Sequence, residues 1–265
     1  MGLRFMGGFM KKYLGSLCAL LTLVLVACGG SASQIMPPML TSSTSIAGVY
    51  EGTTTTAQEN GTETSLLIEE DNSFSLVTDS GLQLLGNLTQ VNSQQYNGTA
   101  VLSYAEDFSM PTLSVSLSFT VNANGSVAAS FSGGAVGSFS VLPSADASAT
   151  SSTLALSSLA GNFSGTTRSM STRQATSWTF TSTGTMSGSD AVSTYSGTLT
   201  QPRANKNPFA ISFTRRGSGA AAVTTSFTGR VWFHPAKGTR PARLMMASRN
   251  TTTGTRGIAG VLAKQ

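Results

Sequence analysis

Residues 112–121 are Thr-Leu-Ser-Val-Ser-Leu-Ser-Phe-Thr-Val, and this stretch decides the fold class. Every second residue from Leu113 to Val121 is apolar, and the residues between them are Ser or Thr. Side chains two apart in a β-strand point to the same face, so the stretch predicts a strand with one buried and one solvated face. The turn-forming residues Asn122-Ala123-Asn124-Gly125 follow, and residues 126–132 alternate again. Together they predict a β-hairpin.

The same signals recur along most of the chain. Apolar residues alternate with polar ones in short stretches, and Gly, Asn or Pro separates one stretch from the next. Most predicted strands are spaced by about 9 to 17 residues, which is typical of a β-sandwich or a β-barrel. We expect eight strands in each half of the chain, centred near Tyr50, Leu67, Leu76, Leu84, Ala100, Val115, Ala129 and Phe139, and near Phe163, Trp178, Met186, Thr198, Ile211, Phe227, Met245 and Ile258.

The two halves begin alike. Residues 45–54 (SIAGVYEGTT) and 158–167 (SLAGNFSGTT) are identical at six of ten positions, with an offset of 113 residues. A repeat of this length indicates a duplicated domain rather than a short solenoid unit. We therefore predict a first domain at 46–142 and a second at 159–265. The Ser-, Ala- and Thr-rich stretch 143–158 is the predicted linker.

A repeated aromatic-x-Gly pattern favours barrels over a sandwich. It occurs at Tyr50/Gly52, Tyr96/Gly98, Phe131/Gly133, Phe163/Gly165, Tyr195/Gly197 and Phe227/Gly229. Gly lets a strand bend sharply, and the ring two positions away can cover the bare backbone on the same face. The two openings, Ala-Gly-x-aromatic-x-Gly, resemble the first strand of lipocalin-like and avidin-like barrels. The resemblance implies an all-β chain with two tandem antiparallel eight-stranded barrel-like domains.

The composition excludes other fold classes. Charged residues make up 10% of the chain, whereas Ser and Thr together contribute 76 residues. Ser, Thr and Gly are weak helix formers, which argues against a helical bundle. Hydrophobic residues reach 40%, so the chain has enough apolar side chains to form a core and does not have the composition of a disordered protein.

The first 27 residues have the layout of a secretory signal peptide. Lys11 and Lys12 precede an apolar run that is shorter than the about 20 residues of a membrane-spanning helix. The run ends Leu25-Val26-Ala27-Cys28, which resembles the lipobox of bacterial lipoproteins. The resemblance implies cleavage after residue 27 and attachment of lipid, with acyl chains such as palmitate, to Cys28. Such lipid anchors a protein without a transmembrane helix. Met10 is a second candidate start beside Met1.

The resemblance also suggests a location. Gly29 follows the Cys, whereas an Asp there commonly retains lipoproteins in the inner membrane, so we expect an outer-membrane lipoprotein on either face of that membrane. Residues 28–45 contain the lipidated Cys and a Ser-, Thr- and Pro-rich stretch that predicts a flexible tether. Cys18 lies in the signal peptide, so the mature chain would contain no disulfide.

Charge is distributed unevenly between the halves. Residues 46–142 contain nine acidic residues and no Lys or Arg, giving net −9. Residues 159–265 contain 13 Lys and Arg against Asp190 alone, giving net +12. An uneven distribution of charge carries information about what a protein associates with and little about its fold. We expect the opposite charges to serve a contact, either between the two halves or with anionic groups of the cell envelope.

The sequence contains no catalytic signature. Gly-x-Ser-x-Gly, phosphate-loop and His-Glu-x-x-His motifs are all missing from it. A triad with His234 would need a partnered Ser and acid, and the second half offers only Asp190. Glu69-Glu70-Asp71 lacks the alternating oxygen ligands of a calcium loop, so we expect a solvated turn there. We therefore expect no catalysis, no metal, no cofactor and no nucleic-acid partner.

One outward face offers a candidate contact site. Arg230, Trp232 and His234 alternate with Phe227, Val231 and Phe233 in the predicted strand, so the first three share the face opposite the core. An outward Trp between cations can bind an anion or a sugar. A ring packed against a loop is the alternative.

These observations favour an envelope lipoprotein that acts as a binding or scaffold module, with an anionic envelope component or a protein as partner. Two alternatives stay open. One is a carrier that holds a small apolar ligand inside a barrel, which small interior residues would favour and bulky ones would not. The other is an enzyme acting on envelope polymers, which would need a cleft with paired carboxylates.

Overall fold

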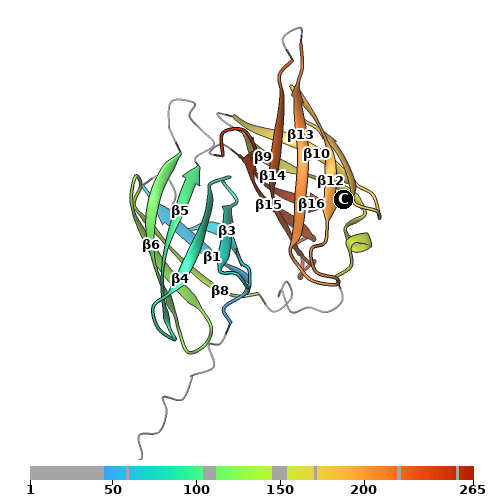
Figure 1. Cartoon of the computed structure of the whole chain (residues 1–265). Helices are drawn as coiled ribbons and strands as arrows, with labels where there is room; N and C mark the ends of the chain where they lie inside the picture. The colour runs from blue at the N-terminus through green and yellow to red at the C-terminus, as the bar shows by residue number, and fades with distance from the viewer. Residues whose placement is uncertain are drawn as a thin grey trace, which may run out of the picture. The chain divides into compact units, whose positions relative to one another are not determined.

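The computed structural model describes residues 45–57, 60–103, 112–144, 154–169, 172–219, 222–254 and 257–265. These residues form sixteen β-strands and one short 3-10 helix (Figure 1). The strands of the first half are β1 (Gly48–Thr56), β2 (Thr62–Ile68), β3 (Ser73–Thr78), β4 (Gln83–Gln90), β5 (Gln95–Ser103), β6 (Leu113–Val121), β7 (Val127–Gly133) and β8 (Gly137–Pro143). The 3-10 helix η1 (Leu156–Leu159) precedes β9 (Gly161–Ser169), β10 (Thr172–Phe180), β11 (Thr185–Ser189), β12 (Ser193–Thr200), β13 (Phe209–Gly217), β14 (Thr224–His234), β15 (Arg243–Asn250) and β16 (Ile258–Lys264).

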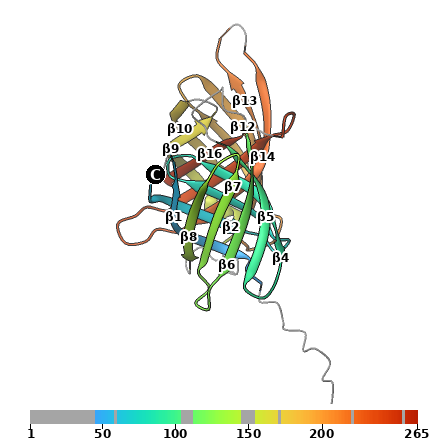
Figure 2. The same cartoon turned by 90° about the vertical axis from the view of Figure 1, so that its left-hand side faces the viewer.

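The strands close into two antiparallel barrels of eight strands each. In the first barrel each strand pairs with the next along the chain, and β1 also pairs with β8. In the second barrel β9 pairs with both β10 and β16. Figures 1 and 2 show the first barrel in blue to green and the second in yellow to red. The predicted fold class is confirmed, and all sixteen predicted strand centres lie within strands.

Bulky side chains pack the interior of each barrel. In β6, the alternating residues Val115, Leu117 and Phe119 are buried while the Ser and Thr residues between them are exposed, as the sequence predicts. The ring centroids of Phe119 and Phe139 lie 5.3 Å apart in the first barrel. In the second, the centroids of Trp178 and Tyr195 lie 4.7 Å apart. Interiors of this kind favour barrels filled by their own side chains over barrels that hold a ligand.

The aromatic-x-Gly pattern marks places where neighbouring strands approach closely. A Cβ on Gly52 would overlap the carbonyl oxygen of Ser140 in β8. A Cβ on Gly229 would overlap the carbonyl oxygen of Ala247 in β15. The rings two residues earlier, Tyr50 and Phe227, are buried in the barrel interiors. Gly is therefore needed to let the sheets curve while the aromatic ring fills the space inside.

Several strands are buried on both faces. In β2, the four residues from Ser65 to Ile68 are all buried, and in β15 the same holds from Leu244 to Ser248. A closed barrel buries only every second residue of a strand, so the outer face of these strands must be covered by other parts of the chain. The covering surface is the outer face of the other barrel, as described below.

Some expectations fall outside the described residues. These are the signal peptide, the lipobox with Cys28 and the tether up to residue 44, together with most of the predicted linker. In the part of the chain that the structure describes, no helix has the length and hydropathy needed to cross a membrane.

Candidate functional site

The outer faces of the two barrels meet in an apolar interface. The first barrel contributes residues of β1–β4 and the second contributes residues of β14–β16. Their side chains form one buried cluster that is separate from both barrel interiors. The cluster consists of Val49, Leu67, Val77 and Leu85 from the first barrel and Trp232, Met245, Ala247 and Ala259 from the second.

Trp232 is the largest side chain of this interface and is 0% exposed. Its indole Nε1 donates a hydrogen bond of 2.7 Å to the hydroxyl of Ser65, which belongs to β2 of the other barrel. The ring thus removes apolar surface from water and still satisfies its single polar group. Trp232 therefore anchors the second barrel on the first.

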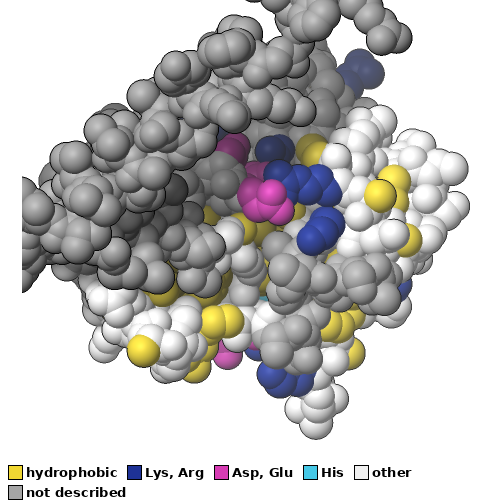
Figure 3. Space-filling view, turned by 60° about the horizontal axis from the view of Figure 1, so that its bottom comes forward, with side chains coloured by type: hydrophobic (Ala, Val, Ile, Leu, Met, Phe, Trp, Pro, Cys, Tyr) yellow, Lys and Arg dark blue, Asp and Glu magenta, His cyan; other side chains and the backbone are white. Residues whose placement is uncertain are grey.

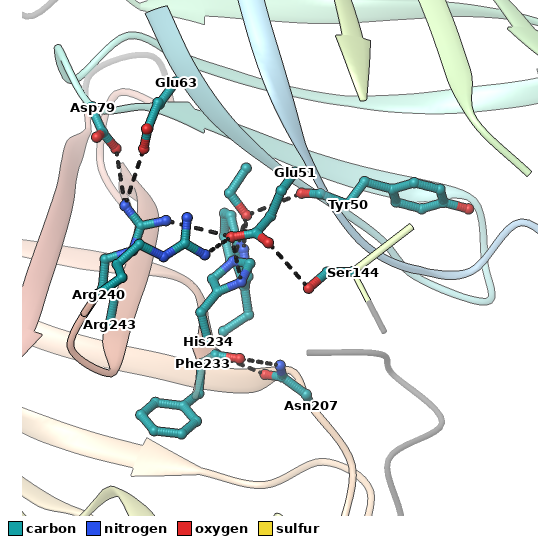
Figure 4. Close-up of polar contacts among 12 residues, drawn as sticks. Tyr50, Glu51, Glu63, Asp79, Ser144, Asn207, Phe233, His234, Arg240 and Arg243 are labelled. Atoms are coloured by element: carbon teal, nitrogen blue, oxygen red, sulfur yellow. Dashed lines mark hydrogen bonds and ion pairs between the residues drawn. The ribbon is translucent and has the colours of Figure 1, made fainter. Parts of the chain in front are cut away.

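Ser65 and His234 continue this hydrogen-bond chain to Glu51. Ser65 Oγ lies 2.7 Å from His234 Nε2. His234 Nδ1 lies 3.2 Å from Glu51 Oε1 (Figure 4). An indole nitrogen only donates, so Ser65 Oγ accepts from Trp232 and can donate its own proton to His234 Nε2. His234 then carries its proton on Nδ1, where it faces the carboxylate of Glu51.

The order Ser65, His234, Glu51 has the connectivity of a serine-hydrolase triad. However, Ser65 is 1% exposed and His234 is 2% exposed. Ser65 Oγ also accepts the Trp232 indole hydrogen. A nucleophilic hydroxyl needs an oxygen that a substrate can approach. While the barrels are in contact, no substrate can reach the Ser65 hydroxyl. The hydrogen bonds of the three residues instead connect the two barrels.

Two arginines of the second barrel surround the carboxylate of Glu51. Arg240 hydrogen-bonds Glu51 Oε1 directly, and an Arg243 Nη lies 3.4 Å from the same oxygen. Arg243 also lies 3.5 Å from a carboxylate oxygen of Glu63 and 3.7 Å from one of Asp79. Figure 4 shows this cluster, and Figure 3 shows acidic and basic side chains side by side on one face of the molecule.

Burial and charge shift the proton affinities in this cluster. Burial lowers the pKa of His234 to about 4, with smaller effects from Glu51, Arg243 and Arg240. His234 is therefore neutral at pH 7. Burial by itself would raise the pKa of Glu51, but the positive charges that face it, from His234 when protonated and from Arg240 and Arg243, hold it below its ordinary value. Burial raises the pKa of Asp79 in spite of the nearby Arg243.

Further ion pairs join acids of the first barrel to bases of the second. Arg230 Nε lies 2.6 Å from Glu69 Oε1, and Arg203 pairs with Glu70 on the surface. The charge asymmetry of the sequence therefore serves a contact between the halves, which is one of the two uses expected for it.

Uncharged groups also cross the interface. The side-chain nitrogen of Gln83 donates to the carbonyl oxygen of Ser248 at 3.1 Å, and the Ser248 amide donates back to Gln83 Oε1 at 3.3 Å. Gln83 is buried, and these two hydrogen bonds satisfy its amide group. They fix the position of the second barrel on the first through uncharged groups.

A groove of about 590 Å³ opens beside this interface. One wall comes from the outer faces of β3 and β4, and the other comes from β12–β15. Hydroxyl and amide groups dominate its polar lining, and two guanidinium groups project from β14 and β15. The lining includes Glu69, Asn87, Ser212, Thr228, Arg230 and Arg249.

The structure changes the interpretation of the predicted contact residues. Arg230, Trp232 and His234 share the outer face of β14 as expected, but Trp232 and His234 are buried against the first barrel. The expectation that Trp232 faces solvent is therefore corrected, because the first barrel covers this face of the second. Arg230 alone of the three lines the groove. Cys28 lies outside the described residues.

Sequence reasoning missed Glu51, Ser65 and Arg249. Sequence reasoning considers only Asp190 of the second half as an acid partner of His234, whereas Glu51 and Ser65 belong to the first half. One signal could have indicated the interface. The stretches 65–68 and 244–247 lack the polar-apolar alternation seen in residues 113–121, as expected for strands covered on both faces. Among the described residues, no group of three or more His, Cys, Asp or Glu side chains is placed to hold a metal ion.

Comparison with known proteins adds one distant structural similarity. Neither the family models nor the curated proteins give a match to this chain. One solved structure, from Bacteroides fragilis and titled a "putative outer membrane protein", aligns over 83% of this chain and 98% of its own. The two chains share 14% sequence identity, and the TM-score is 0.26.

Proposed function

We propose that this chain is a lipid-anchored lipoprotein of the bacterial outer membrane whose two-barrel body binds an envelope component without catalysis. The groove beside the interface is the observation that carries this proposal, because it is a concave surface formed by both barrels in which hydroxyl, amide and guanidinium groups lie among apolar side chains. The lipobox residues 25–28 support the anchoring, and Gly29 supports the outer-membrane location.

The packed barrel interiors support binding outside the barrels rather than inside them. Sixteen buried apolar residues cluster within the second barrel and twenty within the first, and many are aromatic or Leu. The carrier hypothesis requires space that these side chains occupy. A ligand therefore finds its polar partners on the outer surface.

The buried Ser65 supports a role without catalysis. Its hydroxyl is enclosed at the interface by Trp232 and His234. The carboxylates of Glu51 and Glu69 are both engaged by arginines, so neither is a free general base. The acidic residues at the interface stabilise the assembly of the barrels.

Cosedimentation tests this function. The mature chain with Cys28→Ser, which has no lipid, is mixed with purified outer-membrane fragments of a diderm bacterium. We expect saturable cosedimentation that excess unlabelled protein displaces. Recovery of all the protein in the supernatant at every fragment concentration would contradict a binding role, because lipid is no longer present to account for attachment.

A further inference from the structure

We propose that the groove between β3–β4 and β12–β15 binds an acidic saccharide, with the acid group held by Arg249. This inference rests on the proposed function, in which the two-barrel body binds an envelope component, and it identifies the site and the chemical class of the ligand.

Arg249 differs from the other arginines around the interface. The guanidinium groups of Arg203, Arg230, Arg240 and Arg243 each contact a carboxylate of the first barrel. The Arg249 side chain is half-buried, and it has no hydrogen bond or ion pair with any residue that the structure describes. A partly desolvated charge without a counter-charge is unfavourable. Its position in the groove suits an anion supplied by a ligand.

The charge of Arg230 is already neutralised in the same groove. Its Nε lies 2.6 Å from Glu69 Oε1, and both residues line the wall. Arg249 is therefore the group available for an incoming anion. A guanidinium binds a carboxylate or a phosphate through two parallel hydrogen bonds, which favours these groups over a halide or a neutral oxygen.

The surroundings of Arg249 suit a sugar chain better than a single small anion. Asn87, Ser212 and Thr228 present amide and hydroxyl groups in the groove. Arg249 also lines a second depression of about 390 Å³ over the outer faces of β4–β7, which Thr99 and Ser116 line as well. Hydroxyl and amide groups thus lie on both sides of the guanidinium among apolar side chains, so several sugar units can bind while one acid group pairs with Arg249.

Calorimetric titration of the mature chain with Cys28→Ser tests this site. The probes are hexagalacturonate, its fully methyl-esterified form and glucose 1-phosphate. The ester keeps the sugar hydroxyls and lacks the charge, and the phosphate probe distinguishes a phosphosugar from a uronate as the preferred source of the anion. We expect at least one anionic probe to bind and the ester to bind more weakly.

Variants locate the site. Arg249→Gln should weaken binding of the anionic probe about 10- to 100-fold, as expected for a charge-assisted hydrogen bond that is lost, and Arg249→Lys should restore part of it. Arg216→Gln is the matched control, because Arg216 is an exposed arginine of the same barrel outside the groove lining. It should bind as the parent does. Thermal melting confirms that each variant is folded.

Three outcomes would overturn the inference. They are the absence of binding of both anionic probes at millimolar concentration, equal binding of the acid and its ester, and equal effects of Arg249→Gln and Arg216→Gln. The proposed function is tested separately by cosedimentation. If Arg249→Gln still cosediments like the parent, the envelope-binding role stands and this site is wrong. If the parent itself does not cosediment, the proposed function fails.

Discussion

His234 Nδ1 lies 3.2 Å from Glu51 Oε1, although the two residues belong to different barrels. His234 is the single histidine of the chain, and its side chain is almost completely buried at the interface. Its ring connects Glu51 on one side with Ser65 and Trp232 on the other. The stability of the two-barrel assembly should therefore depend on the protonation of this one ring.

Acid should weaken the interface. The pKa of His234 is lowered from 6.5 to about 4, so the unfolded chain takes up a proton first as the pH falls. The stabilisation is fully present above about pH 6.5 and is lost as the pH falls toward 4. From pH 7 to pH 5 we expect a loss of about 2 kcal/mol in the free energy of unfolding. Chemical denaturation at both pH values measures this.

The control for the pH effect is His234→Gln, which keeps a polar side chain and does not titrate in this range. The lowered pKa of Glu51 acts in the same direction but at lower pH, because its stabilisation is present above 4.5 and is lost below it. The effect of Asp79 on stability is opposite in direction. Because its pKa is raised in the folded protein, the free energy of unfolding decreases as the pH rises above 3.8. A parent protein with the same pH slope as His234→Gln between pH 7 and 5 would show that His234 is not the sensor.

Trp232→Ala should separate the barrels. Removal of a buried Trp costs about 3–5 kcal/mol, and here the loss falls on the contact between the barrels because the ring lies outside both interiors. Calorimetry should show one unfolding transition in the parent and two in the variant. A single transition at lower temperature would instead mean that the barrels unfold together even without this anchor.

Glu51→Gln should destabilise the protein more than Glu70→Gln. The Glu51 side chain is 24% exposed and contacts Arg240, Arg243 and His234, so the loss of its charge should cost about 1.5–3 kcal/mol. The Glu70 side chain is 56% exposed, and Arg203 is its one ion-pair partner among the described residues, which predicts about 0–1 kcal/mol. Denaturation midpoints compare the two. Equal losses would show that burial of Glu51 adds nothing.

Much of the fold could be predicted because alternation is a local property. The hairpin of β6 and β7 follows from the residues at 112–132 alone, and the aromatic-x-Gly pairs indicated closed barrels. The contact of Trp232 with Ser65 could not be predicted in this way, because it joins residues far apart in the sequence. The charge asymmetry indicated a contact but not which pairs form it. Arg249 is conspicuous only when the partners of the other arginines are known.

Replacement of Cys28 tests the anchoring. Cys28→Ser should release the protein from membranes or leave an uncut precursor. In bacterial lipoproteins, which this segment resembles, the lipobox cysteine accepts the lipid and marks the cleavage site. Fractionation and intact-protein mass spectrometry measure this. A mature parent protein with an unmodified Cys28 would show that no lipid is attached.

Trp232 joins the outer faces of the two barrels, and its indole hydrogen reports on this contact. Nitrogen-15 NMR resolves the Nε1–H signals of Trp178 and Trp232, the two tryptophans of the chain. Trp178 donates to Thr176 within its own barrel at 2.7 Å and serves as the internal control. We predict slow solvent exchange of the Trp232 indole hydrogen, and we predict that Ser65→Ala shifts the Trp232 signal and leaves the Trp178 signal unchanged. Rapid exchange of Trp232 and an unchanged signal in that variant would contradict it.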